Sequence, residues 1–493
     1  MIAAAMIVAC TNAREEKGEI KLSPTISIDF KKIHQTLDGF GATTMALANT
    51  YPALPQDTLG ELRPAVIKAL YKDVGINTGN LDTVVLESPF TDSVAYKVGW
   101  TGVDKRQAES MKVLLIDLAE PFGFTDYYFG KLNTRWGHPR MKDLMKKDYG
   151  RFLDECARYL TSIMVFWRDS YGITPRFLMP FNEPLSGNRE LADGEASDIA
   201  NILKRTGAML RQEGFNQVKF VVPNEETEEK SLDTATKILA DQEARQYVGA
   251  IGYHPYPYGS VYASVPRILE TSGRGKPDRG RVAVRQKLFE LGQKYSLPLW
   301  MTEVSHPEVD PRSFDHLRGR AIHIHDEFVY AFASAYYAMN NMWDLTTHRD
   351  HFKNDDIYSE ADTVVLVNNE TGEIMITGMG YAIGHYSRWI KPGAVRVEAA
   401  SSEPLLLVTA FLDNTLKKLV TVVINNSSET QNVQFDLKNA QISSSLTGEC
   451  STGQGTFPTS YWQTLDSWQP TSDNTFSAVL PALSVTSIAG VVI

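Results

Sequence analysis

The feature that most constrains the fold is a repeated alternation, from about residue 60 to 390, of short apolar runs with longer segments whose apolar residues have helical spacing. The runs show no polar alternation, which is typical of parallel strands buried on both faces. Seven or eight such strand–helix units predict an α/β fold, a closed (β/α)8 TIM barrel, rather than an open doubly wound sheet. The clearest runs are residues 176–184, 217–226, 249–259 and 297–307.

Two further runs are expected to supply strands of this barrel. The continuous apolar sequence of residues 111–121 predicts its third strand, and residues 342–345 predict its eighth. A G-x-G-x-x-G motif after a first strand, which would favour a dinucleotide-binding sheet, is missing. Residues 39–390 are therefore predicted to form the barrel.

The pattern changes after residue 390 to short β-rich runs separated by polar turns. Several of these runs alternate with period two, as half-buried antiparallel strands do. Residues 391–493 are predicted to form a β-sandwich, with a long surface loop at 442–460. Residues 24–38 are also strand-like, and we expect them to add N-terminal strands to this side domain.

The N-terminus, residues 1–23, resembles a bacterial lipoprotein signal and tether. A short apolar run ends in Ile7, Val8 and Ala9, and Cys10 follows where such signals carry their lipidated cysteine. The run is too short to span a membrane, and no Lys or Arg precedes it as in a typical signal. We expect export to the periplasm or outer surface of a bacterium, with membrane contact only through a lipid anchor at Cys10.

Charge and cysteine content exclude several classes of function. The formal net charge of −10 argues against a general nucleic-acid binder. Three cysteines cannot form a disulfide framework. Because neither a Gly-rich phosphate loop nor a zinc-ligand spacing occurs, we expect no cofactor and no metal. We also expect a monomer.

Two of the predicted strands end in a glutamate. Glu183 ends the run of the fourth strand and Glu303 that of the seventh. Catalytic groups of a (β/α)8 barrel lie at the C-terminal ends of its strands, so both carboxylates are expected at one mouth. Glycosidic-bond cleavage requires such a pair: one group protonates the leaving oxygen, and the other supports the oxocarbenium-like centre. The less solvated glutamate would keep its proton, and the sequence alone leaves open which one that is.

In its motifs the chain resembles glycoside hydrolase family 30, the glucosylceramidase- and xylanase-like group of clan A. Four segments carry the resemblance, and they span most of the chain. They are LDGFGA at 37–42, NEP at 182–184, WMTE at 300–303 and YSRWIKPG at 386–393. The resemblance implies that Glu183 is the general acid/base and Glu303 the nucleophile of a retaining mechanism. It also implies that Asn182 binds the sugar 2-hydroxyl.

Two stretches depart from the family's pattern. Asn80, in GINTGN, stands where relatives carry an arginine, and it cannot supply a permanent positive charge next to the nucleophile. Either another group holds Glu303 ionised, or the substrate contact differs. After the third strand, the aromatic residues Phe122, Phe124, Tyr127, Tyr128 and Trp136 replace a loop rich in tryptophan and proline. These departures leave the sugar open.

Further residues near strand ends are candidates for binding sugar. His254 and Tyr256, with Tyr253 and Tyr258, follow the sixth strand, where rings stack on sugars or simply pack the loop. Trp343 would either form the floor of the sugar-binding site or belong to the apolar core. The other candidates are polar. Arg349 lies in a loop that either binds an acidic or hydroxyl-rich sugar or is a plain polar loop. Glu225 and Glu226 are expected to form a solvated helix start, with a distal subsite as the alternative, and the spacing of His323 and His325 disfavours a metal site.

These observations predict a retaining, endo-type β-glycosidase that acts on a polysaccharide or oligosaccharide. Xylan-, β-1,6-galactan- and β-1,6-glucan-like glycans are the candidate substrates. One alternative is a catalytically silent carbohydrate-binding protein on the same scaffold, to which the loss of arginine at Asn80 gives weight. The other is an exo-acting, glucosylceramidase-like enzyme.

Overall fold

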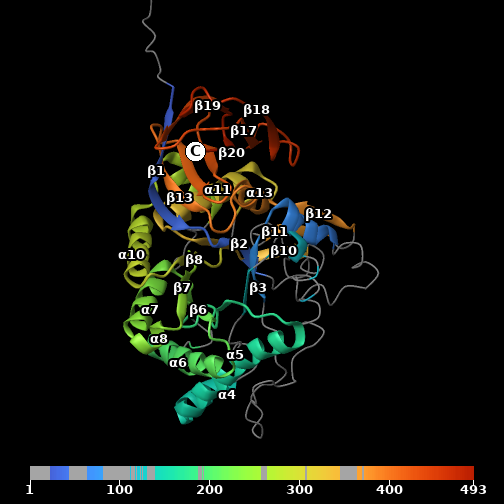
Figure 1. The fold of residues 1–493 in the computed structure, drawn as a ribbon. Helices are drawn as coiled ribbons and strands as arrows, with labels where there is room; N and C mark the ends of the chain where they lie inside the picture. Colours follow the sequence, from blue (N-terminus) through green and yellow to red (C-terminus); the bar gives the residue numbers. More distant parts are fainter. Residues whose placement is uncertain are drawn as a thin grey trace, which may run out of the picture.

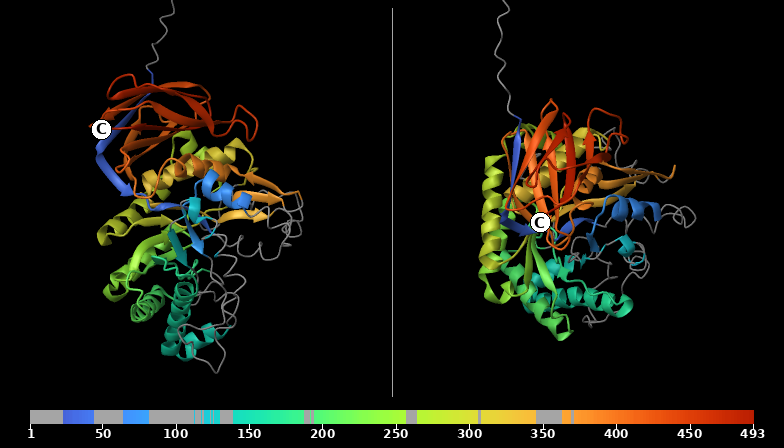
Figure 2. Two further views of the ribbon diagram at one scale, coloured as in Figure 1. Left: turned by 45° about the vertical axis from the view of Figure 1, so that its right-hand side comes forward. Right: turned by 45° about the horizontal axis from the view of Figure 1, so that its top comes forward.

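The structure of the chain is a computed structural model. A barrel with outer helices lies on one side of the molecule, and a β-rich domain lies against it (Figures 1 and 2). The structure describes residues 23–43, 64–81, 112, 117, 119–122, 124, 126–129, 139–186, 191, 194–256, 264–305, 308–344, 363–368 and 371–493.

The barrel is closed by eight parallel strands in chain order, and its last strand pairs with its first. This confirms the predicted (β/α)8 fold class. Its strands are β2 (Gly39–Thr43), β3 (Thr78–Leu81), β4 (Asp126–Phe129), β5 (Phe177–Leu178), β6 (Lys219–Glu225), β7 (Val248–Tyr253), β8 (Leu299–Met301) and β9 (Ala335–Ala338).

Helices pack around the barrel. In the longest of them, α5, the Asp148 side chain caps the start by accepting from the Arg151 amide, and Gly172 ends it with φ 71°. Most of α5 is buried, and Phe152, Cys156 and other apolar residues up to Trp167 belong to the large apolar core. The described helices are α4 (Pro139–Lys147), α5 (Tyr149–Tyr171), α6 (Ala196–Gln212), α7 (Glu228–Ala240), α8 (Gln242–Arg245), α9 (Val265–Glu270), α10 (Arg279–Tyr295), α11 (Phe314–Tyr330) and α13 (Gly378–Ser387), with a π-helix at Lys68–Asp73 and short 3-10 turns at Glu120–Phe122 and Ser272–Arg274.

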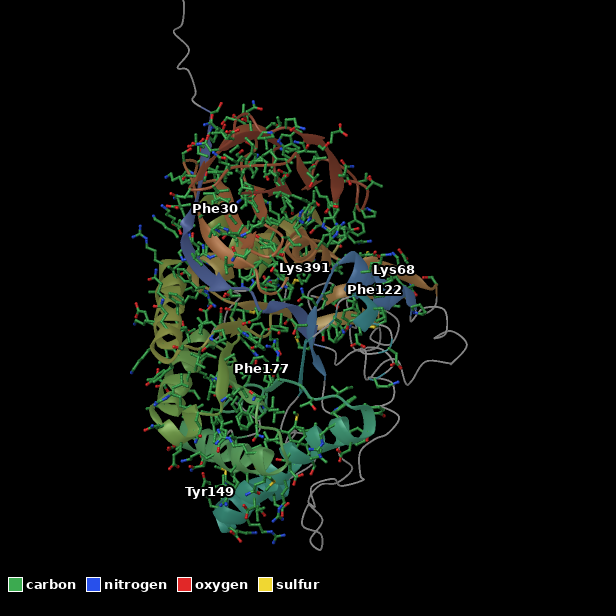
Figure 3. The ribbon with its side chains drawn as sticks, viewed as in Figure 1. Phe30, Lys68, Phe122, Tyr149, Phe177 and Lys391 are labelled. Atoms are coloured by element: carbon green, nitrogen blue, oxygen red, sulfur yellow. The ribbon has the colours of Figure 1, made fainter. Side chains whose placement is uncertain are left out.

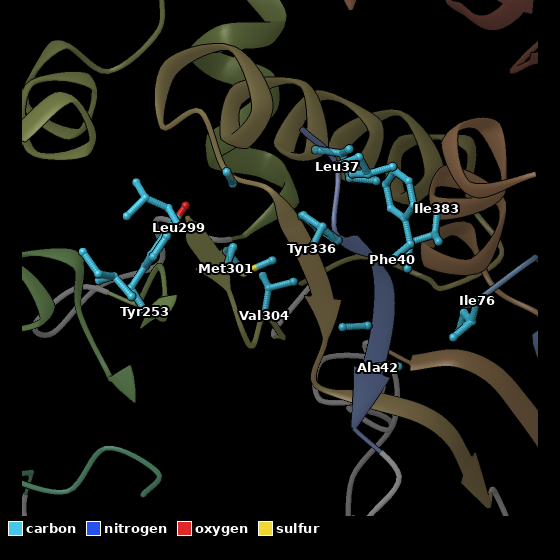
Figure 4. Packing of buried hydrophobic residues seen from close by; sticks show 14 of the residues in the cluster. Leu37, Phe40, Ala42, Ile76, Tyr253, Leu299, Met301, Val304, Tyr336 and Ile383 are labelled. Carbon is cyan, nitrogen blue, oxygen red and sulfur yellow. The ribbon is translucent and has the colours of Figure 1, made fainter. Parts of the chain in front are cut away.

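Alternation along the barrel strands separates two apolar cores. In β8, Trp300 points into the barrel, where its ring lies 4.7 Å from that of Phe177, measured between centroids. Met301 points outward and packs with Val304 and Tyr336 in the core beneath the helices (Figure 4). Figure 3 shows Phe177 among the side chains of the barrel. The interior is thus filled, and a ligand site can form only at its ends.

Two strand predictions were wrong. The third barrel strand is β4, not residues 111–121, of which Lys112 and Asp117 are helical and Glu120 begins a 3-10 turn. A continuous apolar run does not distinguish a buried strand from a buried helix, which explains the error.

The eighth barrel strand is β9, and Trp343 lies beyond it. Trp343 belongs to β10 (Asn340–Asp344), which forms a separate three-stranded sheet with β11 (Thr363–Asn368) and β12 (Glu373–Ile376). The chain leaves the barrel at Met339, whose amide donates to the Val304 carbonyl. The eighth strand was misassigned because two short apolar runs, AYYA in β9 and NNMWD in β10, lie next to each other in the sequence and either could form it.

The side domain is one curled nine-stranded sheet around its own apolar core. β1 (Thr25–Thr36) lies between β13 (Val395–Ser401) and β16 (Gln431–Lys438), so the N-terminal segment is an internal strand of this sheet (Figure 1). In β16, Val433, Phe435 and Leu437 are buried and the residues between them face outward. Its other strands are β13 (Val395–Ser401), β14 (Leu406–Asp413), β15 (Lys418–Asn425), β16 (Gln431–Lys438), β17 (Leu446–Thr452), β18 (Gln463–Trp468), β19 (Thr475–Leu480) and β20 (Ser484–Val491).

The loop predicted at 442–460 contains the strand β17, so that prediction was wrong. Its Ser/Thr-rich sequence is typical of a surface loop, but the Ser451 hydroxyl is buried and forms hydrogen bonds. It contacts Nε2 of His385 at 2.8 Å and accepts from the Trp462 amide at 2.8 Å. Hydroxyl groups that find partners can occupy a buried strand at little cost.

Neutral histidines join the two domains. His385 of α13 bridges the hydroxyls of Ser451 and Ser487, and His325 of α11 contacts the Thr409 hydroxyl at 2.8 Å. Burial lowers the pKa of both imidazoles to about 3. His323 contacts the Tyr336 hydroxyl instead, so His323 and His325 diverge as expected for their spacing. Among the described helices, none is both long and apolar enough to cross a membrane.

We expect His385→Ala to lower the free energy of unfolding by about 2–4 kcal/mol, because it leaves two buried hydroxyls short of a partner. Chemical denaturation at pH 7 measures this. The control is His34→Ala, whose imidazole is partly exposed beside Glu398 and whose loss should cost less than about 1 kcal/mol. Equal effects of the two substitutions would contradict the junction's role.

Candidate active site

The two glutamates singled out in the sequence meet at one mouth of the barrel. Glu183 follows β5, the fourth barrel strand, and Glu303 follows β8, the seventh. One oxygen of each carboxylate and one ring nitrogen of His254 all lie within 4.8 Å of one another. The two glutamates are only 6% and 8% exposed, so the cluster is shielded from bulk water.

His254 connects the two carboxylates. It follows β7, the sixth strand, and its Nδ1 lies 3.1 Å from Glu183 Oε1 and 3.8 Å from Glu303 Oε1. The shorter distance is a hydrogen bond, in which Nδ1–H donates to an ionised Glu183 or Nδ1 accepts from a protonated one. The imidazole can therefore hold Glu183 in place in both protonation states.

Tyr256 holds the other carboxylate. Its hydroxyl lies 3.4 Å from Glu303 Oε1 and 3.1 Å from the Ser305 hydroxyl. Its ring meets the His254 imidazole edge to face, with centroids 5.8 Å apart. The loop after the sixth strand thus places one side chain on each glutamate.

The backbone at Glu183 is itself unusual. Glu183 has φ 53°, in the left-handed region that non-glycine residues rarely occupy. Its amide donates to the Asn224 carbonyl at 2.8 Å, and its carbonyl accepts from the Ser186 amide at 3.0 Å. Strained backbone of this kind is concentrated at functional sites. Asn182 is buried next to it in the chain, at 6% exposure.

The remaining sequence candidates divide into three groups. Trp343 is half-buried on β10 and packs against the large core. Tyr253 faces away from the site and donates to Glu327 at 2.6 Å, so it does not stack on sugar. Three candidates cannot be placed: the Asn80 side chain lies outside what the structure describes, although its backbone is in β3, and Arg349 and Cys10 lie outside the described residues.

Sequence reasoning missed the burial of Glu225. We expected Glu225 and Glu226 to form a solvated helix start, and Glu226 is partly exposed beside Lys230, at 2.7 Å. Glu225, at the end of β6, is wholly buried instead. Burial raises the pKa of Glu225 to about 7, helped by the charge of Glu183 and opposed by Lys230 and His254. The signal available in the sequence was strand alternation, which turns neighbouring glutamates to opposite sides.

The paired glutamates thus lie at the mouth of a barrel that is joined to a C-terminal β-domain. The sandwich carries a specific match: residues 393–488 fit the family model described as the glycosyl hydrolase family 30 beta sandwich domain. A curated relative, the glucuronoxylanase XynC of Bacillus subtilis, is 30% identical over 259 residues. That alignment covers 51% of this chain and 48% of the relative, so the chain spans about half the length of the curated relatives it matches.

Solved structures extend the likeness to the whole fold. The family 30 subfamily 8 xylanase Xyn30A of Clostridium acetobutylicum has a TM-score of 0.64 at 20% identity, covering 94% of this chain and 99% of that one. A structure described as a conserved exported protein from Bacteroides fragilis has a TM-score of 0.66 at 15% identity, covering 94% and 100%. The chain is thus similar to glycoside hydrolase family 30 proteins in the sequence of its C-terminal domain and in its overall fold.

The buried Glu225 carboxyl predicts a pH-dependent stability. Its pKa is about 7 in the folded chain, against an ordinary value of 4.5, so the unfolded state loses this proton at lower pH. Burial of the Glu225 carboxyl destabilises the folded state relative to the unfolded state once the unfolded state can lose this proton. This destabilisation is absent below pH 4.5, grows as the pH rises towards 7, and is on the order of 3 kcal/mol above pH 7. Glu225→Gln should remove this destabilisation. Relative to the parent, its free energy of unfolding should rise by roughly that amount between pH 4.5 and 8.

Denaturant titrations at several pH values measure the effect. The control is Glu226→Gln, which changes a neighbouring, partly exposed carboxylate paired with Lys230 and should show no comparable gain. A pH-independent difference between Glu225→Gln and the parent would contradict the prediction.

Proposed function

We propose that the protein is a retaining, endo-acting β-glycosidase that hydrolyses a xylan-like polysaccharide. The observation that carries this proposal is the close pairing of Glu183 and Glu303, whose nearest oxygens lie within 4.8 Å across the barrel mouth. Inverting glycosidases need about 6.5–9.5 Å between their carboxyl groups to admit a water, whereas retaining ones keep them about 5–5.5 Å apart. The pairing supports direct attack by one carboxylate.

In the first step of the proposed reaction, Glu303 attacks the anomeric carbon and Glu183 gives its proton to the departing glycosidic oxygen. In the second step, Glu183 takes a proton from water as the water displaces Glu303, which restores both groups. Tyr256 would orient the nucleophile through its 3.4 Å contact. His254 would stabilise the Glu183 carboxylate that the first step creates, through the 3.1 Å hydrogen bond. Asn182 would bind the sugar 2-hydroxyl as the ring flattens.

The choice of xylan is supported by the comparisons. The curated relative is described as a glucuronoxylanase and the similar Clostridium enzyme as a xylanase. β-1,6-Glucan and β-1,6-galactan are the next substrates to test. Export, with lipidation at Cys10, is part of the same proposal; it is supported by the N-terminal sequence and by a structural neighbour described as exported.

The test is release of reducing sugar from xylan, β-1,6-glucan and β-1,6-galactan by the parent and by two variants. Glu303→Gln removes the nucleophile and should lower kcat by roughly 10⁴-fold or more. Glu183→Gln should lower kcat/KM on xylan strongly but spare kcat/KM on a dinitrophenyl glycoside, because the first step on that substrate needs no protonation of the leaving group. Early products of mixed length indicate endo action, and single sugars indicate exo action. Sugar binding without turnover by the parent would establish the silent carbohydrate-binding alternative.

The proposed mechanism requires no metal, although two carboxylates and an imidazole are groups that a divalent cation can bind. We therefore expect activity to be unchanged after dialysis against EDTA. Loss of activity on chelation, restored by adding Zn²⁺ or Ca²⁺, would contradict the carboxylate-pair mechanism.

A further inference from the structure

Asn224 occupies a special position between the two glutamates. It lies near the end of β6, the fifth strand, where the pairing with β7 is irregular between Pro223 and Glu225. It is wholly buried and has φ 63°. An asparagine can adopt this left-handed conformation more easily than most residues, and the bulge directs its side chain into the space between neighbouring strand ends.

Three hydrogen bonds tie Asn224 to the segments that carry both glutamates. Its carbonyl accepts from the Glu183 amide at 2.8 Å, and its side-chain amide donates to the Phe181 carbonyl at 3.1 Å. On the other side, its Oδ1 accepts from the hydroxyl of Thr302, the residue immediately before Glu303. One side chain thus links the ends of the fourth and seventh strands.

The surrounding residues are arranged to fit this link. The Thr302 amide donates to the Tyr253 carbonyl at 3.0 Å, which adds the sixth strand to the same network. Gly252 leaves room for the amide, because a Cβ there would lie 3.3 Å from Asn224 Oδ1 and 2.9 Å from a Val221 methyl. The site requires a donor and an acceptor on one short side chain, and aspartate, with acceptors only, cannot replace both.

We propose that Asn224 is a positioning residue that fixes the separation of Glu183 and Glu303 by bridging their strand ends. This inference rests on the proposed glycosidase function, because it assigns Asn224 a role in placing that function's two carboxylates. Asn224 acts through the neighbouring backbone. Proton transfer and nucleophilic attack depend steeply on distance, and a displacement of about 1 Å can cost roughly 100-fold in rate.

Three variants separate the parts of the link. Asn224→Gly keeps the left-handed backbone without strain and removes both side-chain bonds. Asn224→Asp keeps the acceptor for Thr302 and loses the donor to Phe181, so it loosens only the Glu183 side. Thr302→Val removes the hydroxyl on the Glu303 side. Asn439→Gly is the matched control, since Asn439 also has a left-handed backbone, φ 68°, but lies exposed in the sandwich.

The rates to compare are those on xylan and on a dinitrophenyl xyloside, normalised to folded protein counted by near-ultraviolet circular dichroism. We expect Asn224→Gly to lower kcat on xylan by roughly 10–100-fold with KM changed less than about threefold. Asn224→Asp should lower kcat/KM on xylan more than kcat/KM on the dinitrophenyl xyloside, because only the first step on xylan needs acid assistance. Thr302→Val should slow both equally, and Asn439→Gly should match the parent.

If Asn224→Gly does not fold, the contrast between Asn224→Asp and Thr302→Val carries the test alone. Parent-like kcat in the folded Asn224 variants, or an equal loss of kcat/KM on both substrates for Asn224→Asp, would overturn the positioning role while leaving the proposed function intact. A parent inactive on all the glycans tested would instead count against the proposed function.

Discussion

Ring closure by parallel hydrogen bonding is the constraint on which the rest of the structure depends. Pairing of β9 with both β8 and β2 fixes eight strand ends around one mouth, and residues far apart in the sequence become neighbours there. The packed interior, with Trp300 and Phe177 in ring contact, prevents a site from forming deeper inside. A ligand site is therefore confined to the residues just past the strands, and Glu183, His254 and Glu303 all occupy such positions.

Holding acidic groups this close out of water is costly, and the strand ends are braced on both sides. Inside the mouth, His254 lies between the two glutamates and Tyr256 contacts Glu303. Outside the barrel, the hydroxyl of Tyr253, the residue before His254, donates to Glu327 of α11. Glu327 in turn forms an ion pair with the buried Arg285 of α10. Tyr253, the last residue of β7, thus anchors the strand to the helices, and the next residue, His254, shapes the site. This packing holds Glu183 in its strained backbone conformation.

The sequence was most informative where a chemical pattern and a strand end coincided. The barrel class and the placement of Glu183 and Glu303 after the fourth and seventh strands followed from apolar runs that end in NEP and TE. The third strand could not be located, because an apolar run at 111–121 satisfies helix and strand alike. Trp343 was misplaced by one strand, since two short runs adjoin there. The burial of Glu225 and the bridge through Asn224 depend on a bulge and on contacts between distant strands, which local pattern does not encode.

The most direct measurement of the central claim is the anomeric configuration of the first product, followed by proton NMR as xylan is cleaved. A carboxylate pair this close predicts that the β-anomer appears first and that the α-anomer grows in only by mutarotation. Initial appearance of the α-anomer would mean that a water molecule attacks directly, and the close pairing of Glu183 and Glu303 would then not describe the working enzyme.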